Sequence, residues 1–301
     1  LCGMQIIDTH THLYLNQFED DVDQVIQRAF DSGLEKFIFP AIDSSHYKDM
    51  HELRNRYPDN IYLMSGLHPV SVKENYMNEL DIVVKSLETH NYVAIGEIGI
   101  DLYWDKTFLK QQQEAFEFQI RLAISNDLPI VIHCRDGFDE IFEILDVEKC
   151  SKMRGVFHCF TGTLQQAKRA VNLGFKLGIG GVVTFKNGGI DKFINQINLS
   201  HILLETDAPY LSPVPYRGKR NESSYITYVL NKLSNLYNKS EIEIADLTTK
   251  NALKILSKNL TLYIFGHTKI IFVRWQVLFY DLSRLIFDLH YPALEAFYIP
   301  P

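Results

Sequence analysis

Six side chains of metal-binding types stand at the ends of short apolar runs along this chain. They are His10, His12, Glu97, His133, His158 and Asp207. His10 and His12 are two positions apart, so in a strand, where side chains alternate, both imidazoles lie on one side and could bind one ion. Imidazole and charged groups that point into a buried site are costly unless they are paired or bind a metal. The set therefore predicts a metal centre.

These candidate ligands offer nitrogen and oxygen but no thiolate, which favours Zn, Mn, Mg, Ni or Fe over a cysteine-rich structural zinc site. Six ligands exceed the need of one four-coordinate ion, so we expect two divalent ions with Glu97 as a bridge. Ions about 4 Å apart can generate a hydroxide nucleophile and clamp the oxygens of an ester or phosphodiester. Cys134 and Cys159 directly follow histidines, so alternation directs them away from the site, and we expect buried packing thiols.

Eight short apolar runs must position these groups, and they alternate with longer segments of helical period. The predicted strands are 6–10, 37–42, 61–66, 93–97, 129–133, 155–158, 175–179 and 202–207, with helical patterns over segments such as 20–32, 107–126 and 164–173. Eight buried strands, each followed by a helix, predict an α/β fold, the (β/α)8 TIM barrel. Its active site lies where the carboxyl ends of the strands meet. An open doubly wound sheet is the alternative, but the glycine-rich first turn typical of that fold is lacking.

Composition excludes several classes of protein. The 301 residues include 30 basic and 37 acidic side chains, a net charge of −7, which argues against a basic nucleic-acid-binding tail. No run of about 18 uncharged apolar residues and no signal peptide is evident, so we expect no membrane partner. Four cysteines without a CxxC pair favour a reducing compartment, and we predict a cytoplasmic location.

The chain divides at about residue 257. We expect residues 4–257 to form the barrel as a single domain and residues 258–301 to form an irregular C-terminal extension of unknown role. That extension holds 10 aromatic residues among its 44, without helical or strand period. Two interpretations stay open: a segment that packs on the barrel, or a read-through or frame-shifted end.

Eight motifs occur in a fixed order. They are DTHTH at 8–12, GLHP at 66–69, GEIGID at 96–101, HCRD at 133–136, HCFTG at 158–162, LETDAPYL at 204–211, PYRGKRNE at 215–222 and Asn-Ala at 251–252. This series resembles the TatD family of metal-dependent deoxyribonucleases, within the amidohydrolase-like barrels. The resemblance covers residue 4 to about residue 256, and the PYRGKRNE block is its most specific part.

The resemblance implies a hydrolase that cleaves DNA phosphodiester bonds with a metal-activated water, typically as a 3′-5′ exodeoxyribonuclease using two divalent ions such as Mg, Mn or Zn. By motif, His10, His12 and Asp207 would hold the first ion, His133 and His158 the second, and Glu97 would bridge them. Asp207 could also orient or deprotonate the attacking water, which makes Asp207 and Glu97 the expected catalytic residues. Glu205 is an additional candidate for a contact to metal or water, with a buried polar network as the alternative.

Substrate contacts are expected from cations beside the last strand. Arg217, Lys219 and Arg220 form a candidate phosphate clamp, and Gly218 would let their loop turn sharply. His68 and Arg135 are further candidates for phosphate contacts. So few contacts imply a short footprint on DNA, single-stranded or at a 3′ end, and we expect no stable protein partner.

Two other functions remain open on the same residues. A dinuclear centre also polarises carbonyl groups, so an amidohydrolase or esterase acting on a small ester, lactone, amide or aminoacyl ester is the main alternative. The cationic loop, and Glu97 in place of a carbamylated lysine, favour phosphoester chemistry. A metal-stabilised binding protein without activity is the weaker alternative.

Overall fold

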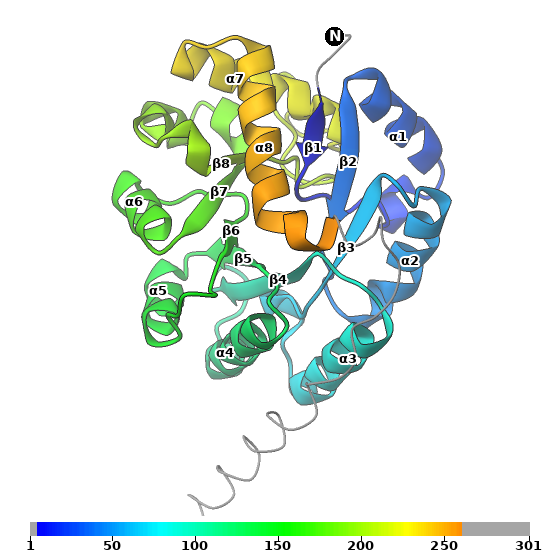
Figure 1. Ribbon diagram of the computed structural model, residues 1–301, viewed down its shortest axis with the longest axis vertical. Coiled ribbons are helices and arrows are strands. Elements are labelled where there is room, and N and C mark those ends of the chain that lie inside the picture. The colour runs from blue at the N-terminus through cyan, green and yellow to red at the C-terminus, as the bar shows by residue number, and fades with distance from the viewer. Residues whose placement is uncertain (1–4, 261–301) are drawn as a thin grey trace, which may run out of the picture. The chain divides into compact units, whose positions relative to one another are not determined.

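A computed structural model describes residues 5–260, and the predicted extension lies outside the described residues from position 261 onward. Eight parallel strands form one sheet in the order of the sequence, as a TIM barrel requires (Figure 1). They are β1 (Ile6–Asp8), β2 (Leu34–Phe39), β3 (Ile61–Ser65), β4 (Ala94–Asp101), β5 (Ile130–Arg135), β6 (Gly155–Phe157), β7 (Phe175–Ile179) and β8 (Ile202–Leu204). The predicted fold class is confirmed.

Helices surround the strands and one helix crosses an end of the barrel (Figure 1). They are α1 (Val22–Asp31), α2 (Tyr47–Arg56), α3 (Tyr76–Thr89), α4 (Leu109–Ser125), α5 (Phe138–Val147), α6 (Leu164–Asn172), α7 (Ile226–Tyr237) and α8 (Glu241–Leu260). The helix after β7 is replaced by short 3-10 turns, and two helices follow β8 instead. Within the described part of the chain, every helix falls short of the length or the hydropathy that crossing a bilayer would need.

Local signals explain where several helices begin and end. At α6, the Thr163 side chain accepts a hydrogen bond from the Gln166 N–H, and the Gln166 side chain accepts one from the Thr163 N–H. This capping box satisfies two N–H groups that a helix start would otherwise leave free. The last residue of α7 is Tyr237, and the next residue, Asn238, has a left-handed φ of 51° that stops the helix.

Strand ends differ from the predicted ones at the functional edge of the barrel. β1 ends at Asp8 and β8 at Leu204, so the histidines and the aspartate that follow them lie in loops. Conversely, β4 and β5 run longer than predicted, because their ladder continues until Asp101 pairs with Arg135. The alternation rule therefore extends to Asp101, four residues beyond Glu97 and on the same side of the strand.

Side-chain and loop hydrogen bonds close the seam between the first and last strands. The Thr9 N–H and hydroxyl both donate to the Leu204 carbonyl, at 3.1 and 2.9 Å. The Thr206 N–H and hydroxyl donate to the two oxygens of the Asp8 carboxylate, at 3.0 and 2.6 Å. The loops that follow β1 and β8 are thus fixed to each other.

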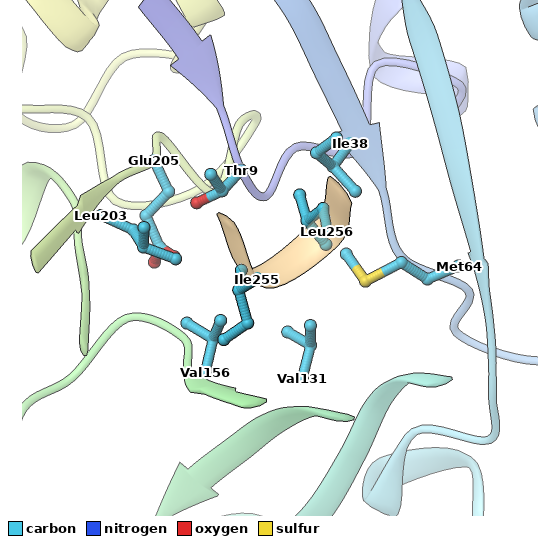
Figure 2. Close-up of a pocket in the computed structure, with 9 residues that line it drawn as sticks. All are labelled: Thr9, Ile38, Met64, Val131, Val156, Leu203, Glu205, Ile255 and Leu256. Carbon is cyan, nitrogen blue, oxygen red and sulfur yellow. The ribbon is translucent and has the colours of Figure 1, made fainter. Parts of the chain in front are cut away.

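Apolar side chains fill the barrel interior below this edge. Val131 and Val156 from the strands meet Ile255 and Leu256 from α8, as Figure 2 shows. The space left between them is about 10 Å³, roughly the room for one water molecule. The interior is therefore a packed core, and α8 closes the end of the barrel that lies away from the strands' carboxyl ends.

Asn251, from the Asn-Ala motif, attaches α8 to the barrel. Its side-chain amide donates to the carbonyls of Leu199 and Ile202, at 2.7 and 2.9 Å, just before and at the start of β8. Nearby, the Thr249 hydroxyl donates to the Gln5 carbonyl at the start of β1, at 2.7 Å. One helix thus holds the beginnings of both seam strands.

We expect Asn251→Ala to lower the free energy of unfolding by about 2–4 kcal/mol, because two buried carbonyls lose their donor. Urea unfolding followed by circular dichroism measures this as a lower midpoint at constant slope. Lys250→Ala, at the exposed neighbouring position, is the matched control and should change stability by less than about 0.5 kcal/mol. Equal shifts in the two variants would contradict this role for Asn251.

Candidate metal centre

The first group of candidate ligands is assembled by the barrel seam. The Asp207 N–H donates to the His10 carbonyl at 2.9 Å, and the His12 N–H donates to the Ala208 carbonyl at 2.7 Å. These backbone bonds place Asp207 Oδ1 3.4 Å from His12 Nε2 and 3.8 Å from His10 Nε2. Asp207 adopts a left-handed φ of 57°, an unfavourable conformation for a residue with a side chain, and this conformation is part of how the loop forms.

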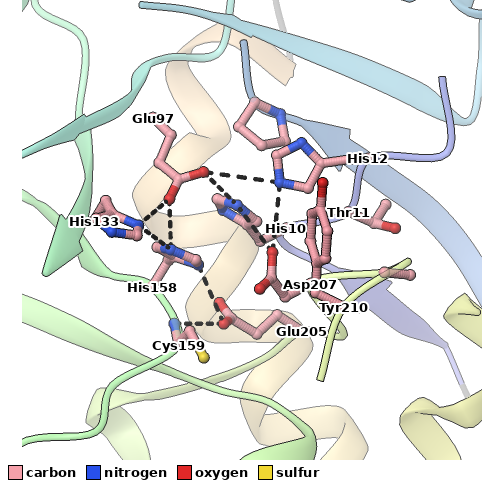
Figure 3. A network of polar contacts seen from close by, with 12 residues as sticks. His10, Thr11, His12, Glu97, His133, His158, Cys159, Glu205, Asp207 and Tyr210 are labelled. Atoms are coloured by element: carbon pink, nitrogen blue, oxygen red, sulfur yellow. Dashed lines mark hydrogen bonds and ion pairs between the residues drawn. The ribbon is translucent and has the colours of Figure 1, made fainter. Parts of the chain in front are cut away.

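Glu97 lies at the centre of the site and is only 2% exposed. Its Oε2 lies 3.0 Å from His10 Nε2 and 3.8 Å from His12 Nε2. Its Oε1 lies 2.7 Å from both His133 Nδ1 and His158 Nε2. The two oxygens of one carboxylate therefore face two different groups of imidazoles (Figure 3).

Other side chains orient the histidines from behind. The Tyr14 hydroxyl donates its only proton to the Pro40 carbonyl at 2.6 Å, so it accepts from His12 Nδ1 at 2.9 Å. This leaves the lone pair of His12 Nε2 facing the carboxylates, as a metal ligand requires. Asp101 Oδ2 lies 2.9 Å from His133 Nε2 and fixes that ring in the same way.

Glu205 lies behind His158 and is fully buried. Its Oε1 accepts the Cys159 backbone N–H and lies 3.6 Å from His158 Nδ1 (Figure 3). Its Oε2 has no hydrogen-bond partner among the described residues. Of its two expected roles, these contacts match the buried polar network. A Cβ at Gly178 would lie 2.1 Å from that Oε2, so the carboxylate fits only because this position is glycine.

The two predicted packing thiols differ in their surroundings. Cys134 is half-buried and packs against the hydrophobic core, as expected. Cys159 is also half-buried but lies beside the site, with a left-handed φ of 41°. Burial first, and then the carboxylates of Asp207 and Glu205, raise the pKa of Cys159 well above its ordinary value, so its sulfur stays a neutral thiol.

The charge balance of the site calls for a cation. Burial opposes ionisation of Glu97, yet the surrounding imidazoles hold the pKa of its carboxyl well below the ordinary value. The His10 and His158 rings stack at 3.8 Å and 13°, and burial together with His158 lowers the pKa of His10. If both stacked imidazoles were protonated, their like charges would repel each other strongly. Neutral imidazoles avoid this repulsion and bind divalent ions well. The Nδ1 atoms of both rings also lack hydrogen-bond partners within residues 5–260.

These observations fit a divalent metal centre. In the part of the chain that the structure describes, ligand atoms close enough to share one ion occur in three sets: His10 with His12 and Glu97, His10 with His158 and Asp207, and His68 with Glu97 and His133. The six predicted ligands thus lie together in one cluster. The sets share members, so the geometry accommodates more than one ion around Glu97.

His68 lies deeper than expected for a phosphate contact. Its Nε2 is 3.3 Å from both Glu97 Oε1 and His133 Nδ1, within the cluster itself. Arg135, the other candidate outside the cationic loop, places its guanidinium 3.6 Å from the centre of the Tyr103 ring.

In the cationic loop at residues 217–220, Arg217 lines a pocket and Arg220 holds the loop to a neighbouring helix. Arg217 stacks on Phe185 at 3.7 Å and, with Lys186, lines an open pocket of about 550 Å³ formed by loops after β6, β7 and β8. Arg220 forms two hydrogen bonds to Asp21, both at 2.7 Å, and is thereby engaged with the start of α1.

The cationic loop turns sharply at Gly218, as expected, and its third cation, Lys219, is exposed. Gly218 has a left-handed φ of 80°, which the sharp turn requires. Lys219 is exposed, with its Nζ 5.8 Å from the centre of the Tyr216 ring.

Sequence reasoning missed Tyr14, Asp101 and Lys186. Asp101 is four residues after Glu97 in the same strand, so a period of two carried its signal, whereas Tyr14 follows His12 in the loop after β1, where no such period applies. No local pattern marks Lys186, which reaches the pocket through the irregular chain that follows β7.

Comparisons with known proteins agree with this geometry. A family model described as TatD related DNase matches residues 7–257. The uncharacterized metal-dependent hydrolase YabD of Bacillus subtilis is 39% identical over 257 residues, which cover 84% of this chain and all of that protein. The crystal structure of YjjV, a TatD homolog from Escherichia coli K12, is 31% identical with a TM-score of 0.77, covering 84% of this chain and 98% of that one. A TatD family hydrolase from Entamoeba histolytica, 23% identical with a TM-score of 0.73, covers 85% and 99% and supports the fold alone.

We expect Gly178→Ala to destabilise the protein more than Gly180→Ala. The first places a methyl group 2.1 Å from the buried Glu205 Oε2, whereas the second meets nothing closer than 3.5 Å. Thermal unfolding of both variants, and of Gly178→Ala with Glu205→Ala, measures the difference. Because the double variant removes the clash, its loss of stability should be smaller than the sum of the single losses. Additive losses would show that the clash is not the cause.

Proposed function

Because this chain belongs to the TatD family of metal-dependent hydrolases, we propose that it hydrolyses DNA phosphodiester bonds and removes nucleotides from the 3′ end of a short single strand. The observation that carries this proposal is Glu97, a buried carboxylate whose two oxygens face separate groups of imidazoles. Paired ions clamp the attacking and leaving oxygens of a phosphodiester. The description of the matching family as a DNase supports the same substrate.

From composition alone, we also propose a cytoplasmic location.

We propose that His10, His12 and Asp207 hold one divalent ion, that His133 and His158 hold the second, and that Glu97 bridges them. Mg, Mn and Zn all suit this nitrogen and oxygen donor set. Bound there, such ions would polarise the phosphoryl oxygens and lower the pKa of water.

Asp207 is the proposed general base. Burial opposes its ionisation, but His12, whose Nε2 lies 3.4 Å away, and the neighbouring imidazoles hold the pKa of the carboxyl below its ordinary value. At neutral pH it is therefore ionised and able to accept the proton of the attacking water. The water oxygen bonds to phosphorus, the bond from phosphorus to the 3′ oxygen breaks, and that oxygen takes a proton from solvent.

Substrate binding is proposed for the cations around the opening. Arg217 and Lys219 would contact phosphates, and Arg135 would do so from the opposite side of the barrel edge, at the end of β5. His68 would meet the phosphate that reaches the ligand cluster. Arg220 would act by anchoring the loop through Asp21. Few cations on a chain of net charge −7 limit the footprint to one or a few nucleotides.

Digestion of a single-stranded oligonucleotide, labelled at its 3′ or its 5′ end, tests the proposal in the presence of Mg and then Mn. We expect stepwise loss of nucleotides from the 3′ end, and we expect Asp207→Ala to lower the rate by at least about 100-fold, the usual contribution of a general base. Chelation with EDTA should abolish the activity.

Other outcomes of this digestion would contradict the proposal. Full activity in Asp207→Ala would overturn the assigned base. If folded, metal-loaded protein leaves DNA intact but cleaves a small ester, lactone or amide, the chain acts on carbonyl substrates instead.

Metal content tests the proposed division of ligands. After equilibrium dialysis against Mn or Zn, we expect two ions per chain in the unaltered protein. We expect one ion in His133→Ala, because the group around His10, His12 and Asp207 stays intact. Glu97→Ala should weaken both sites. Mass spectrometry of the dialysed protein counts the ions, and two ions retained in His133→Ala would refute the assignment.

A further inference from the structure

Two large aromatic side chains are exposed in the loop that follows β4. Tyr103 is 55% exposed and Trp104 is 69% exposed. Their rings meet edge to face, with centroids 4.9 Å apart and an angle of 89°. Single exposed apolar residues are common on protein surfaces, but a fixed pair of rings at the edge that carries the active site calls for an explanation.

The pair is tied directly to the metal centre. Asp101 Oδ1 accepts hydrogen bonds from the backbone N–H groups of Tyr103 and Trp104, at 3.0 and 3.4 Å. The other oxygen of the same carboxylate lies 2.9 Å from His133 Nε2. One side chain thus positions both a candidate metal ligand and the start of the aromatic loop.

Arg135 completes the arrangement from the neighbouring strand. Its guanidinium carbon lies 3.6 Å from the centre of the Tyr103 ring and 5.4 Å from that of Trp104. The β4–β5 ladder pairs Arg135 with Asp101, so the cation is held level with the loop. We call Tyr103, Trp104 and Arg135 the aromatic platform.

We propose that the aromatic platform is a nucleobase-binding subsite, on which one base of the single-stranded substrate stacks beside the scissile phosphate. The rings supply the stacking surface, and the guanidinium supplies charge next to a phosphate. This combination is typical of proteins that bind single strands without sequence preference, because every base has a π-face. The inference rests on the proposed function, and it adds a contact to the base where the other contacts reach only phosphate.

The kinetic test compares two oligonucleotides that differ only at the 3′-terminal nucleotide, which either carries its base or is a baseless deoxyribose unit. For each variant, kcat/KM for the base-bearing substrate is divided by kcat/KM for the baseless one. Trp104→Ala should lower this ratio by about 5- to 150-fold, the range expected for one stacked base. Trp104→Phe keeps a ring and should retain most of the ratio. Val147→Ala, an 81% exposed position at the end of α5, is the matched control and should leave the ratio unchanged. An unchanged ratio in Trp104→Ala would overturn the subsite.

A binding measurement separates failure of the subsite from failure of the proposed function. The chain has two tryptophans, so the difference in fluorescence between the unaltered protein and Trp104→Phe isolates the signal of Trp104. A deoxynucleoside 5′-monophosphate should quench this signal, and deoxyribose 5-phosphate should not. Quenching without any DNA hydrolysis would support the subsite and refute the nuclease. Hydrolysis of DNA without base-dependent quenching would do the reverse.

Discussion

The buried Glu97 carboxylate needs opposite charge and hydrogen bonds around it, and the rest of the barrel is arranged to supply them. An ionised carboxylate removed from water is very costly unless opposite charge and hydrogen bonds replace its hydration. Here imidazoles from β5 and from the chain after β1, β3 and β6 provide that replacement, and bound cations would complete it. A barrel is suited to this task, because its parallel strands end around one small area and can each contribute a side chain.

Three side chains contact the histidines on the side away from Glu97. Tyr14, Asp101 and Glu205 each face the far nitrogen of one imidazole, at 2.9, 2.9 and 3.6 Å. The hydrogen bonds of Tyr14 and Asp101 decide which nitrogen of His12 and His133 presents its lone pair to the centre. Asp101 has a second task, because the same carboxylate also accepts the backbone N–H groups of Tyr103 and Trp104, so one side chain holds both His133 and the start of the aromatic loop.

The sequence predicts the barrel and the six clustered candidate ligands because both depend on patterns that recur from strand to strand. Long-range partners leave no such trace. Arg220 was expected at a phosphate, but it pairs with Asp21, 199 positions away, and only the folded chain reveals that neighbour. His68 lies within the cluster because β3 ends close to Glu97, which spacing alone does not specify. The early ends of β1 and β8 arise likewise from hydrogen bonds across the seam.

The seam between β1 and β8 joins Thr9 to Leu204, 195 positions apart, and it also brings His10 and His12 to Asp207. Contacts of such sequence separation form late, since the entropy of a very long loop must be lost before they form. During synthesis, the first group of ligands therefore stays dispersed until β8 has been made and has paired. A partly made chain therefore lacks the complete set of His10, His12 and Asp207, and the candidate metal centre is assembled only when the ring of strands is complete.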